Sequence, residues 1–208
     1  GQSTAVGFGA KSTGNASNAI GGASVAAGDF STAVGQEARA EADFALAAGY
    51  KANASGGQST AVGFGSKSTG NAATAIGSSS LAEGDYSIAL GQESRTGAGK
   101  NFATALGYKA NASGWSSFAQ GAYAEASGGG SIAIGDSSKA TTNDTIAIGT
   151  KAQATGFRAI SIGKSNIVSG DKSAAIGNDN KFTTDNTFVI GSNVTKTLDN
   201  SVFLGKDA

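Results

Sequence analysis

The chain has 208 residues, a formal net charge of zero, and no cysteine, methionine or histidine. These absences exclude thiol chemistry, thiolate and imidazole metal sites and the most common general base, and the scattered single charges argue against a nucleic-acid partner. Leu, Ile, Val and Phe are scarce beside Ala, Gly, Ser and Thr, so no thick hydrophobic core can form, and 33 glycines without any proline exclude collagen.

One glycine-anchored pentapeptide recurs fifteen times along the chain, with clear copies at Ser3–Gly7, Ser31–Gly35 and Ser131–Gly135. The anchors are 14 residues apart, except that 16 residues separate Gly91 from Gly107. A fixed short period over a whole chain indicates one supersecondary unit stacked on itself. The anchors are Gly7, Gly21, Gly35, Gly49, Gly63, Gly77, Gly91, Gly107, Gly121, Gly135, Gly149, Gly163, Gly177, Gly191 and Gly205.

Period-two alternation on each side of the anchor predicts two short strands in every repeat. A second glycine usually follows seven residues after the anchor, as at Gly14 and Gly28, and the two glycines mark the chain reversals. Each repeat is then a flattened coil of strand, turn, strand and turn. Coils stacked in register give two parallel sheets face to face, so we expect an all-β solenoid of 14-residue coils.

Two columns of the repeat decide which side chains face inward. Ala stands two residues before the anchor in twelve of fifteen repeats, and small residues also stand four before it and three and five after it. Val, Ile or Leu stands one residue before the anchor in thirteen repeats, with Ala48 and Gln120 as the exceptions. We expect the small columns to point inward and the aliphatic column outward. The opposite facing, with aliphatic side chains inside, is left open by the sequence.

An outward aliphatic row is larger than the apolar patches that soluble monomers expose, so it predicts an obligate homo-oligomer. Each fully buried side chain contributes about 1.5–3 kcal/mol, so the whole row can supply tens of kcal/mol. The predicted subunit interface consists of Val6, Ile20, Val34, Val62, Ile76, Leu90, Leu106, Ile134, Ile148, Ile162, Ile176, Ile190 and Leu204.

We expect residues 1–208 to form a single domain. Within it, the regular repeat is modified at several places. Residues 1–56 and 57–114 are near-duplicate blocks of four coils, and the two-residue insertion falls within the second block, in a turn at Thr96–Asn101. An exposed aromatic anchor there would make a ligand-contact region, whereas a wider turn capped by aromatic packing against a neighbouring chain is the structural alternative. That candidate region consists of Lys100, Asn101, Trp115, Phe118 and Tyr123.

The coils in residues 157–208 carry larger side chains in the inward columns, including Asn166, Val168, Asn180 and Phe182. We therefore expect modified, wider coils there.

No residue pattern predicts catalysis. Acid pairs such as Glu41 and Asp43 are explained by solvated turns, and the run Gly128–Gly130 lacks the Lys-Ser/Thr that follows in a phosphate loop. We expect no catalytic residue, no metal site and no cofactor, and hence no enzyme.

The repeated Ser-x-Ala-Ile/Val-Gly pentapeptide, followed three residues later by Ser or Ala, resembles the head repeats of YadA-type trimeric autotransporter adhesins over nearly the whole chain. The resemblance implies a left-handed parallel β-roll, three of which pack into a trimeric head with the aliphatic column toward the trimer core. It also implies display on the bacterial cell surface through an outer-membrane anchor, with a stalk and a neck, none of which is in this sequence. Since the chain begins and ends inside a repeat, we expect it to be part of a longer protein.

The function implied is attachment to host-cell or extracellular-matrix proteins by a repeated surface that multiplies weak contacts. A spacer that displays a more distal binding domain, or a module for self-association in biofilms, is the alternative. An ice-binding solenoid fits less well, because the threonine column that contains Thr4, Thr32 and Thr60 is interrupted by Leu46 and Phe118.

Overall fold

The computed structural model describes residues 2–207, and in these residues all regular secondary structure is strand. The strands are two to five residues long and alternate between two sheets. The contacts divide the chain into two compact units, unit 1 up to Lys109 and unit 2 from Ala110. The all-β solenoid of 14-residue coils is confirmed, and each unit is described below by itself.

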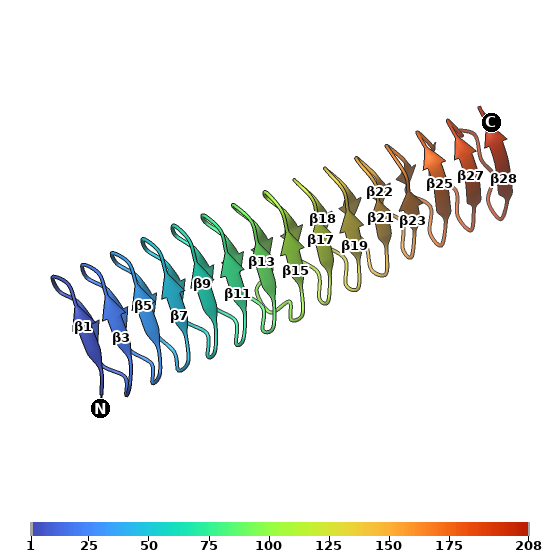
Figure 1. Cartoon of the computed structure of the whole chain (residues 1–208). Helices are drawn as coiled ribbons and strands as arrows, with labels where there is room; N and C mark the ends of the chain where they lie inside the picture. Colours follow the sequence, from blue (N-terminus) through green and yellow to red (C-terminus); the bar gives the residue numbers. More distant parts are fainter. Residues whose placement is uncertain (1, 208) are drawn as a thin grey trace. The chain divides into compact units, whose positions relative to one another are not determined.

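Unit 1 contains two parallel sheets, which we call the anchor-strand sheet and the return-strand sheet (Figure 1, blue to green). The anchor-strand sheet of unit 1 consists, in order, of β1 (Thr4–Val6), β3 (Asn18–Ile20), β5 (Thr32–Val34), β7 (Leu46–Ala48), β9 (Thr60–Val62), β11 (Thr74–Ile76), β13 (Ile88–Leu90) and β15 (Thr104–Leu106). Its return-strand sheet consists of β2 (Lys11–Ser12), β4 (Val25–Ala26), β6 (Arg39–Ala40), β8 (Asn53–Ala54), β10 (Lys67–Ser68), β12 (Leu81–Ala82) and β14 (Arg95–Thr96).

Unit 2 repeats the same arrangement with longer strands at its end. Its anchor-strand sheet consists of β17 (Phe118–Gln120), β19 (Ile132–Ile134), β21 (Ile146–Ile148), β23 (Ile160–Ile162), β25 (Ala174–Asn178), β27 (Phe188–Ser192) and β28 (Val202–Lys206). Its return-strand sheet consists of β16 (Asn111–Ala112), β18 (Glu125–Ala126), β20 (Lys139–Ala140), β22 (Gln153–Ala154), β24 (Ile167–Val168) and β26 (Lys181–Phe182).

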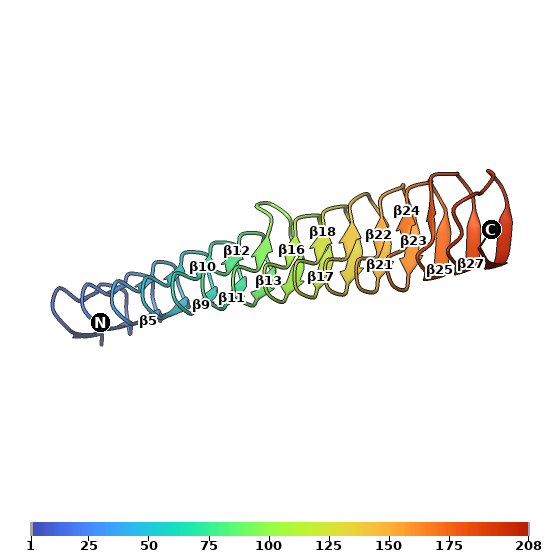
Figure 2. The same cartoon turned by 90° about the horizontal axis from the view of Figure 1, so that it is seen from above.

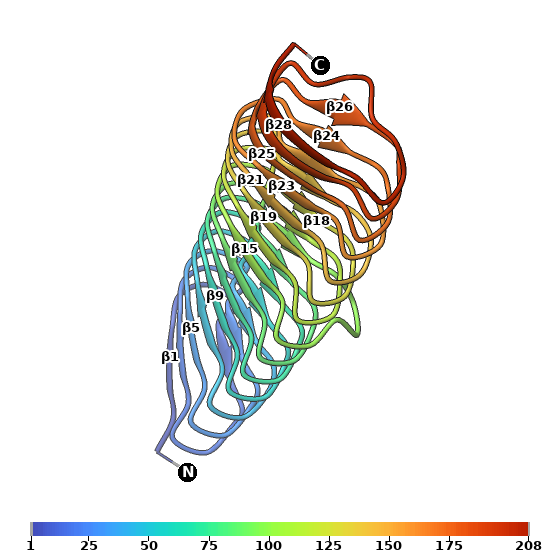
Figure 3. The ribbon, with the colours of Figure 1, turned by 90° about the vertical axis from the view of Figure 1, so that its right-hand side faces the viewer.

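Within each unit, successive coils stack in parallel register (Figure 3). Thr32 N–H, for example, donates to the carbonyl of Ala45 at 2.9 Å. A residue pairs with the one fourteen positions later, as Ala47 does with Ala61, but Ala89 pairs with Ala105 because of the insertion. The extra residues leave the coil outline as a loop before β15 (Figure 2), where open space surrounds Gly99. The insertion therefore lengthens a turn and leaves the sheet register intact.

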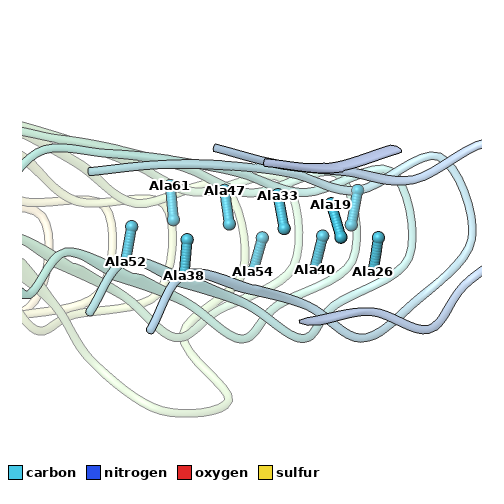
Figure 4. Close-up of a cluster of buried hydrophobic side chains, with 10 residues drawn as sticks. Ala19, Ala26, Ala33, Ala38, Ala40, Ala47, Ala52, Ala54 and Ala61 are labelled. Carbon is cyan, nitrogen blue, oxygen red and sulfur yellow. The ribbon is translucent and has the colours of Figure 1, made fainter. Parts of the chain in front are cut away.

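In all but the last coils, the interior is filled by alanine, serine and threonine. Ala33 and Ala47 of the anchor-strand sheet point toward Ala40 and Ala54 of the return-strand sheet, and all four are fully buried (Figure 4). The adjacent Ile20 is 43% exposed. The predicted facing is confirmed and the opposite one is wrong, because only small side chains fit between sheets joined by such short turns.

The two glycine columns are needed for different reasons. The anchor Gly21 has a φ of +133°, and a Cβ there would lie 2.5 Å from the carbonyl oxygen of Gly35. Gly28, seven residues on, has no positive φ, but a Cβ would lie 2.0 Å from the carbonyl oxygen of Ala42 in the next coil. Close stacking of successive turns thus excludes a side chain at Gly21 and Gly28, whereas Ala42 and Thr142 occupy the second column in other coils.

The sequence did not reveal that both turns also require left-handed residues other than glycine. The residues two and nine after the anchor have positive φ in coil after coil, and they include Ala23 at 54° and the bulky Phe30, Phe44 and Tyr86 at 57–58°. A side chain in this conformation costs about 1–2 kcal/mol relative to the right-handed region. Backbone hydrogen bonds from coil to coil hold these residues in place, such as the 2.8 Å bond from Phe44 N–H to the Asp29 carbonyl.

The last coils of unit 2 have a different interior, as the sequence predicts. Val168, Val189 and Phe182 are buried where unit 1 has Ala, Ser or Thr. Asn166 and Asn180 form an internal ladder, in which the Asn180 backbone and side-chain amides both donate to Asn166 Oδ1 at 3.0 Å. The Asn180 side chain also donates to the Gly191 carbonyl at 2.9 Å, so these buried amides are satisfied as burial of polar groups requires.

Candidate functional site

The thirteen predicted interface residues lie on the outer surface of the anchor-strand sheet, and none is buried. Val6 and Leu204 are exposed by 55% and 73%, and residues between them, such as Ile76 and Ile134, are exposed or half-buried. Each unit therefore carries a continuous apolar row, since the paired strands set these residues side by side. A role in subunit contact stays a prediction, because one chain does not show it.

A second outward column, three residues before the anchor, differs between the units. In unit 1 it is mostly polar, with Thr4, Asn18, Thr32, Leu46, Thr60, Thr74, Ile88 and Thr104. In unit 2 it is apolar throughout, with Phe118, Ile132, Ile146, Ile160, Ala174, Phe188 and Val202. The apolar face of the anchor-strand sheet is therefore two columns wide in unit 2 and about one in unit 1. The change from threonine to aliphatic and aromatic residues along this column is a signal that the sequence itself contains.

The candidate ligand-contact residues are spread over different parts of the coil. In unit 1, Lys100 and Asn101 lie in the loop and turn before β15, where Asn101 Oδ1 accepts a hydrogen bond from Asp85 N–H at 3.2 Å. In unit 2, Trp115 lies in the turn before β17, Phe118 on the outer face of β17, and Tyr123 in the turn after it. Trp115 and Tyr123 are more than half exposed but stand at opposite ends of the strand. Their role in ligand binding stays a prediction.

A ladder of Asp and Asn side chains runs along the turn that leads into each anchor strand, which we call the return turn. In this ladder a side-chain oxygen accepts the backbone N–H of the residue fourteen positions earlier, as Asp29 Oδ1 does from Asn15 at 2.8 Å and Asp85 Oδ1 from Asn71 at 2.8 Å. The bonds from Asn15 hold the pKa of the Asp29 carboxyl below its usual value. Asp43, which is expected from the sequence to be a solvated turn residue, belongs to this ladder, because its Oδ1 accepts the Asp29 N–H at 2.9 Å.

Aromatic rings stack in pairs on the return turns of unit 1. Phe30 and Phe44 have ring centroids 5.1 Å apart and planes within 8°, and Tyr86 and Phe102 have centroids 5.3 Å apart and planes within 5°. All four rings are more than half exposed. These pairs lie in corresponding coils of the near-duplicate blocks, so the duplication has preserved both.

The turn after each anchor strand, the anchor turn, has a different recurring group. In unit 1, Tyr50 stacks on Phe64 with centroids 5.3 Å apart, and the Lys51 ammonium lies 5.0 Å from the Tyr50 ring centroid and 3.7 Å from Glu37. Contact with the Tyr50 side chain and then attraction by Glu37 raise the pKa of Lys51. The second block repeats the lysine part of this group, with the Lys109 ammonium 5.2 Å from the Tyr108 ring centroid and 3.5 Å from Glu93.

The described residues 2–207 contain no group of three His, Cys, Asp or Glu side chains placed to hold a metal ion. Over the same range, no helix is long and apolar enough to cross a membrane.

Comparison with protein families places the repeat among known ones. The family described as YadA head domain repeat (2 copies) matches residues 17–38, 40–66, 68–94, 98–124, 126–152 and 154–180. The matched segments cover most of both units. A comparison with curated proteins gave no match.

Among solved structures, the chain is similar to the crystal structure of the collagen-binding domain of the Yersinia adhesin YadA. The two sequences are 23% identical, the similarity covers 87% of this chain and 70% of that one, and the TM-score is 0.38.

Proposed function

This chain belongs to the family of YadA head domain repeats and has the family and fold of an adhesin head region, and on that premise we propose that it forms a homotrimer that attaches a bacterial surface to host-cell or extracellular-matrix proteins. The proposed localisation is the cell surface, with anchorage in the outer membrane through a segment outside this sequence. The proposal includes neither a nucleic-acid partner nor a cofactor.

The observation that carries the proposal is the exposed aliphatic row on the anchor-strand sheet of each unit. A side chain such as Ile20 or Leu90 gains about 1.5–3 kcal/mol when it is fully removed from water. Burying thirteen such side chains contributes more free energy than the association of separate chains costs, which is about 4–15 kcal/mol or more. Three copies packed by these faces would leave the return-strand sheets and both sets of turns outward.

Such an assembly would act through repetition. Each outward turn and return strand would be presented three times, and successive coils would present related surfaces about 4.8 Å apart. Weak individual contacts then combine, because the second and third contacts form at the effective concentration set by the first. No enclosed site is required for this kind of attachment.

Purified assembled protein is the material for the test. Light scattering is expected to give three times the mass of the 20.1 kDa chain, and immobilised collagen, laminin and fibronectin, together with cultured host cells, provide the attachment panel. A folded monomer that binds none of these above a stalk-only control would contradict the proposal.

The near-duplicate blocks favour a second candidate function, a spacer that holds a distal domain away from the cell, since length has changed by whole coils. Deletion of residues 57–114, the second near-duplicate block of four whole coils, separates the two. A spacer lacking them keeps full attachment at the distal domain, whereas a head whose coils bind directly loses part of it.

A further inference from the structure

A groove of about 390 Å³ opens along the return turns of unit 1. The rings of Phe44 and Tyr86 stand at its two ends, three coils apart, and the return turns of the two coils between them carry no ring. Residues from those coils and from the Phe44 turn form its floor, namely Asp43, Gly57, Gln58, Asn71 and Ala72. The volume lies within the range of about 300–1,000 Å³ that is typical of small-molecule sites.

The rings at the two ends of the groove are each held in place by a stacked neighbour outside the groove. Phe44 stacks on Phe30, and Tyr86 stacks on Phe102, so one face of each ring is covered by its partner. The coil next to the opposite face of Phe44 carries Gln58, and the coil next to the opposite face of Tyr86 carries Ala72. The uncovered ring faces therefore point into the groove, and each residue is 58% exposed.

The groove lies where the Asp/Asn ladder of the return turns is interrupted. Asp43 Oδ1 accepts the Asp29 N–H at 2.9 Å, and the Gly57 N–H donates to Asn71 Oδ1 at 3.2 Å. Gly57 has no side chain that could accept from Asp43, so the Asp43 N–H has no acceptor among the residues that the structure describes. A donor thus stands at the floor of the groove in place of a ladder bond.

The other backbone donors of the groove are already used. Gln58 N–H donates to the Asp43 carbonyl at 2.9 Å, Ala72 N–H to the Gly57 carbonyl at 2.8 Å, and Tyr86 N–H to the Asn71 carbonyl at 2.8 Å. An extended peptide, which binds by a series of main-chain hydrogen bonds, would therefore find a single donor. The groups left for a ligand are that donor, the second carboxylate oxygen of Asp43 and the side-chain amides.

We propose that this groove binds a saccharide. A pyranose ring has an apolar face that stacks on an exposed aromatic ring, and an edge of hydroxyl groups that both donate and accept hydrogen bonds. Tyr86 or Phe44 would carry the apolar face. The Asp43 N–H and carboxylate, with the amides of Gln58 and Asn71, would bond the hydroxyl groups. The inference rests on the proposed adhesive role and names a chemical class of target for it.

The substitution Gly57→Asp tests the site most directly, because it would restore the missing ladder bond and fill the groove. A Cβ at Gly57 would lie 3.3 Å from Asn71 Oδ1, the end of a flexible side chain, and its φ is not positive. Gly129 of unit 2 provides a matched control. Its N–H donates to Asn143 Oδ1 at 2.9 Å in the same way, and a Cβ there would lie 3.4 Å from the same kind of atom.

The experiment applies the assembled protein to a printed array of neutral and sialylated oligosaccharides, followed by calorimetry with the strongest binder. We expect binding to weaken at least tenfold in Gly57→Asp and in Tyr86→Ala. Binding is expected to remain at the wild-type level in Gly129→Asp and in Phe157→Ala, which removes an exposed ring from a return turn of unit 2. Thermal melts check that the variants fold, and if Gly57→Asp does not, Tyr86→Ala decides.

Two results would overturn the inference, namely no oligosaccharide bound by the wild-type protein, or binding that survives both groove substitutions unchanged. If cells and matrix proteins are still bound in either case, the proposed adhesive function stands and only the saccharide site fails. If the wild-type protein binds oligosaccharides but neither cells nor matrix proteins, the adhesive function fails instead.

Discussion

Units 1 and 2 share one backbone repeat but differ on the outer face of the anchor-strand sheet and in the interior between the two sheets. In unit 1 the interior side is Ala, Ser or Thr, and the outer side has one aliphatic column beside a mostly threonine column. In unit 2 the outer side is apolar in both columns except at Gln120, and the last coils bury Val168, Phe182 and Val189 inside.

The difference teaches that the hydrogen-bonded coil fixes the backbone, while each column of side chains can change by itself. Coil-to-coil bonds such as Thr32 N–H to the Ala45 carbonyl and Ile132 N–H to the Thr145 carbonyl are both 2.9 Å long. The same coil therefore supports a narrow or a broad apolar face. We infer that unit 2 contributes more of the assembly energy per coil, and that unit 1 carries the stacked exposed rings.

The largest expected effect concerns the broad apolar face of unit 2. Replacing Ile132 and Ile134 by serine removes two neighbouring outward side chains and is expected to cost the assembly about 3–6 kcal/mol per chain. Val34→Ser in unit 1, where the neighbouring Thr32 is already polar, is expected to cost about half as much or less. Light scattering over a dilution series measures both, and equal losses would contradict the comparison.

A smaller effect is expected from one interior column. Valine is native and buried at Val168 in unit 2, but the equivalent position in unit 1 is the fully buried Ala54. Ala54→Val is expected to lower the free energy of unfolding by about 1–3 kcal/mol, because the thin interior cannot accept two more carbons without strain. Urea unfolding measures the change, and Ala54→Ser, which imitates Ser68 in the same column, is the control. No change in the urea midpoint for Ala54→Val would mean that both interiors are equally adaptable.

The smallest effect concerns the ladder at Asp29 in unit 1. The pKa of Asp29 is lower in the folded chain than in the unfolded one, where it is about 3.9, because Asn15 donates to its carboxylate. The stability from this group is therefore complete above about pH 5 and is lost as the pH falls through the folded pKa. Thermal melts between pH 7 and pH 2 are expected to show a steeper loss for the wild-type chain than for Asp29→Asn, which keeps an oxygen acceptor but does not titrate there.

The inward or outward facing of each column of the repeat could be predicted from the sequence, because the size of the side chains in the column decides it. A row of alanines such as Ala33, Ala47 and Ala61 fits only a thin interior, and the aliphatic row beside it must then face outward. Two glycines per repeat placed the turns, and the larger residues after Gly156 predicted the altered interior that Asn166 and Phe182 form.

The details of the turns could not be predicted in this way. The left-handed conformation of Phe44 or Tyr86 contradicts the preference of bulky residues, and only the bonds from the preceding coil impose it. The Asp/Asn column was visible in the sequence, but which backbone group each oxygen accepts depends on the spacing between coils. The groove at Gly57 depends on the same spacing, so no local motif marked it.

The direction of the backbone hydrogen bonds has a mechanical consequence. Within each unit these bonds join one coil to the next, so they lie along the stacking direction. A tensile force in that direction breaks the hydrogen bonds of one coil at a time. It does not load the bonds of many coils in shear at once. Each released coil of fourteen residues would extend from about 4.8 Å along the stacking direction to about 48 Å of unfolded chain. Under load such a unit would yield stepwise and absorb work before its contacts to a surface are broken.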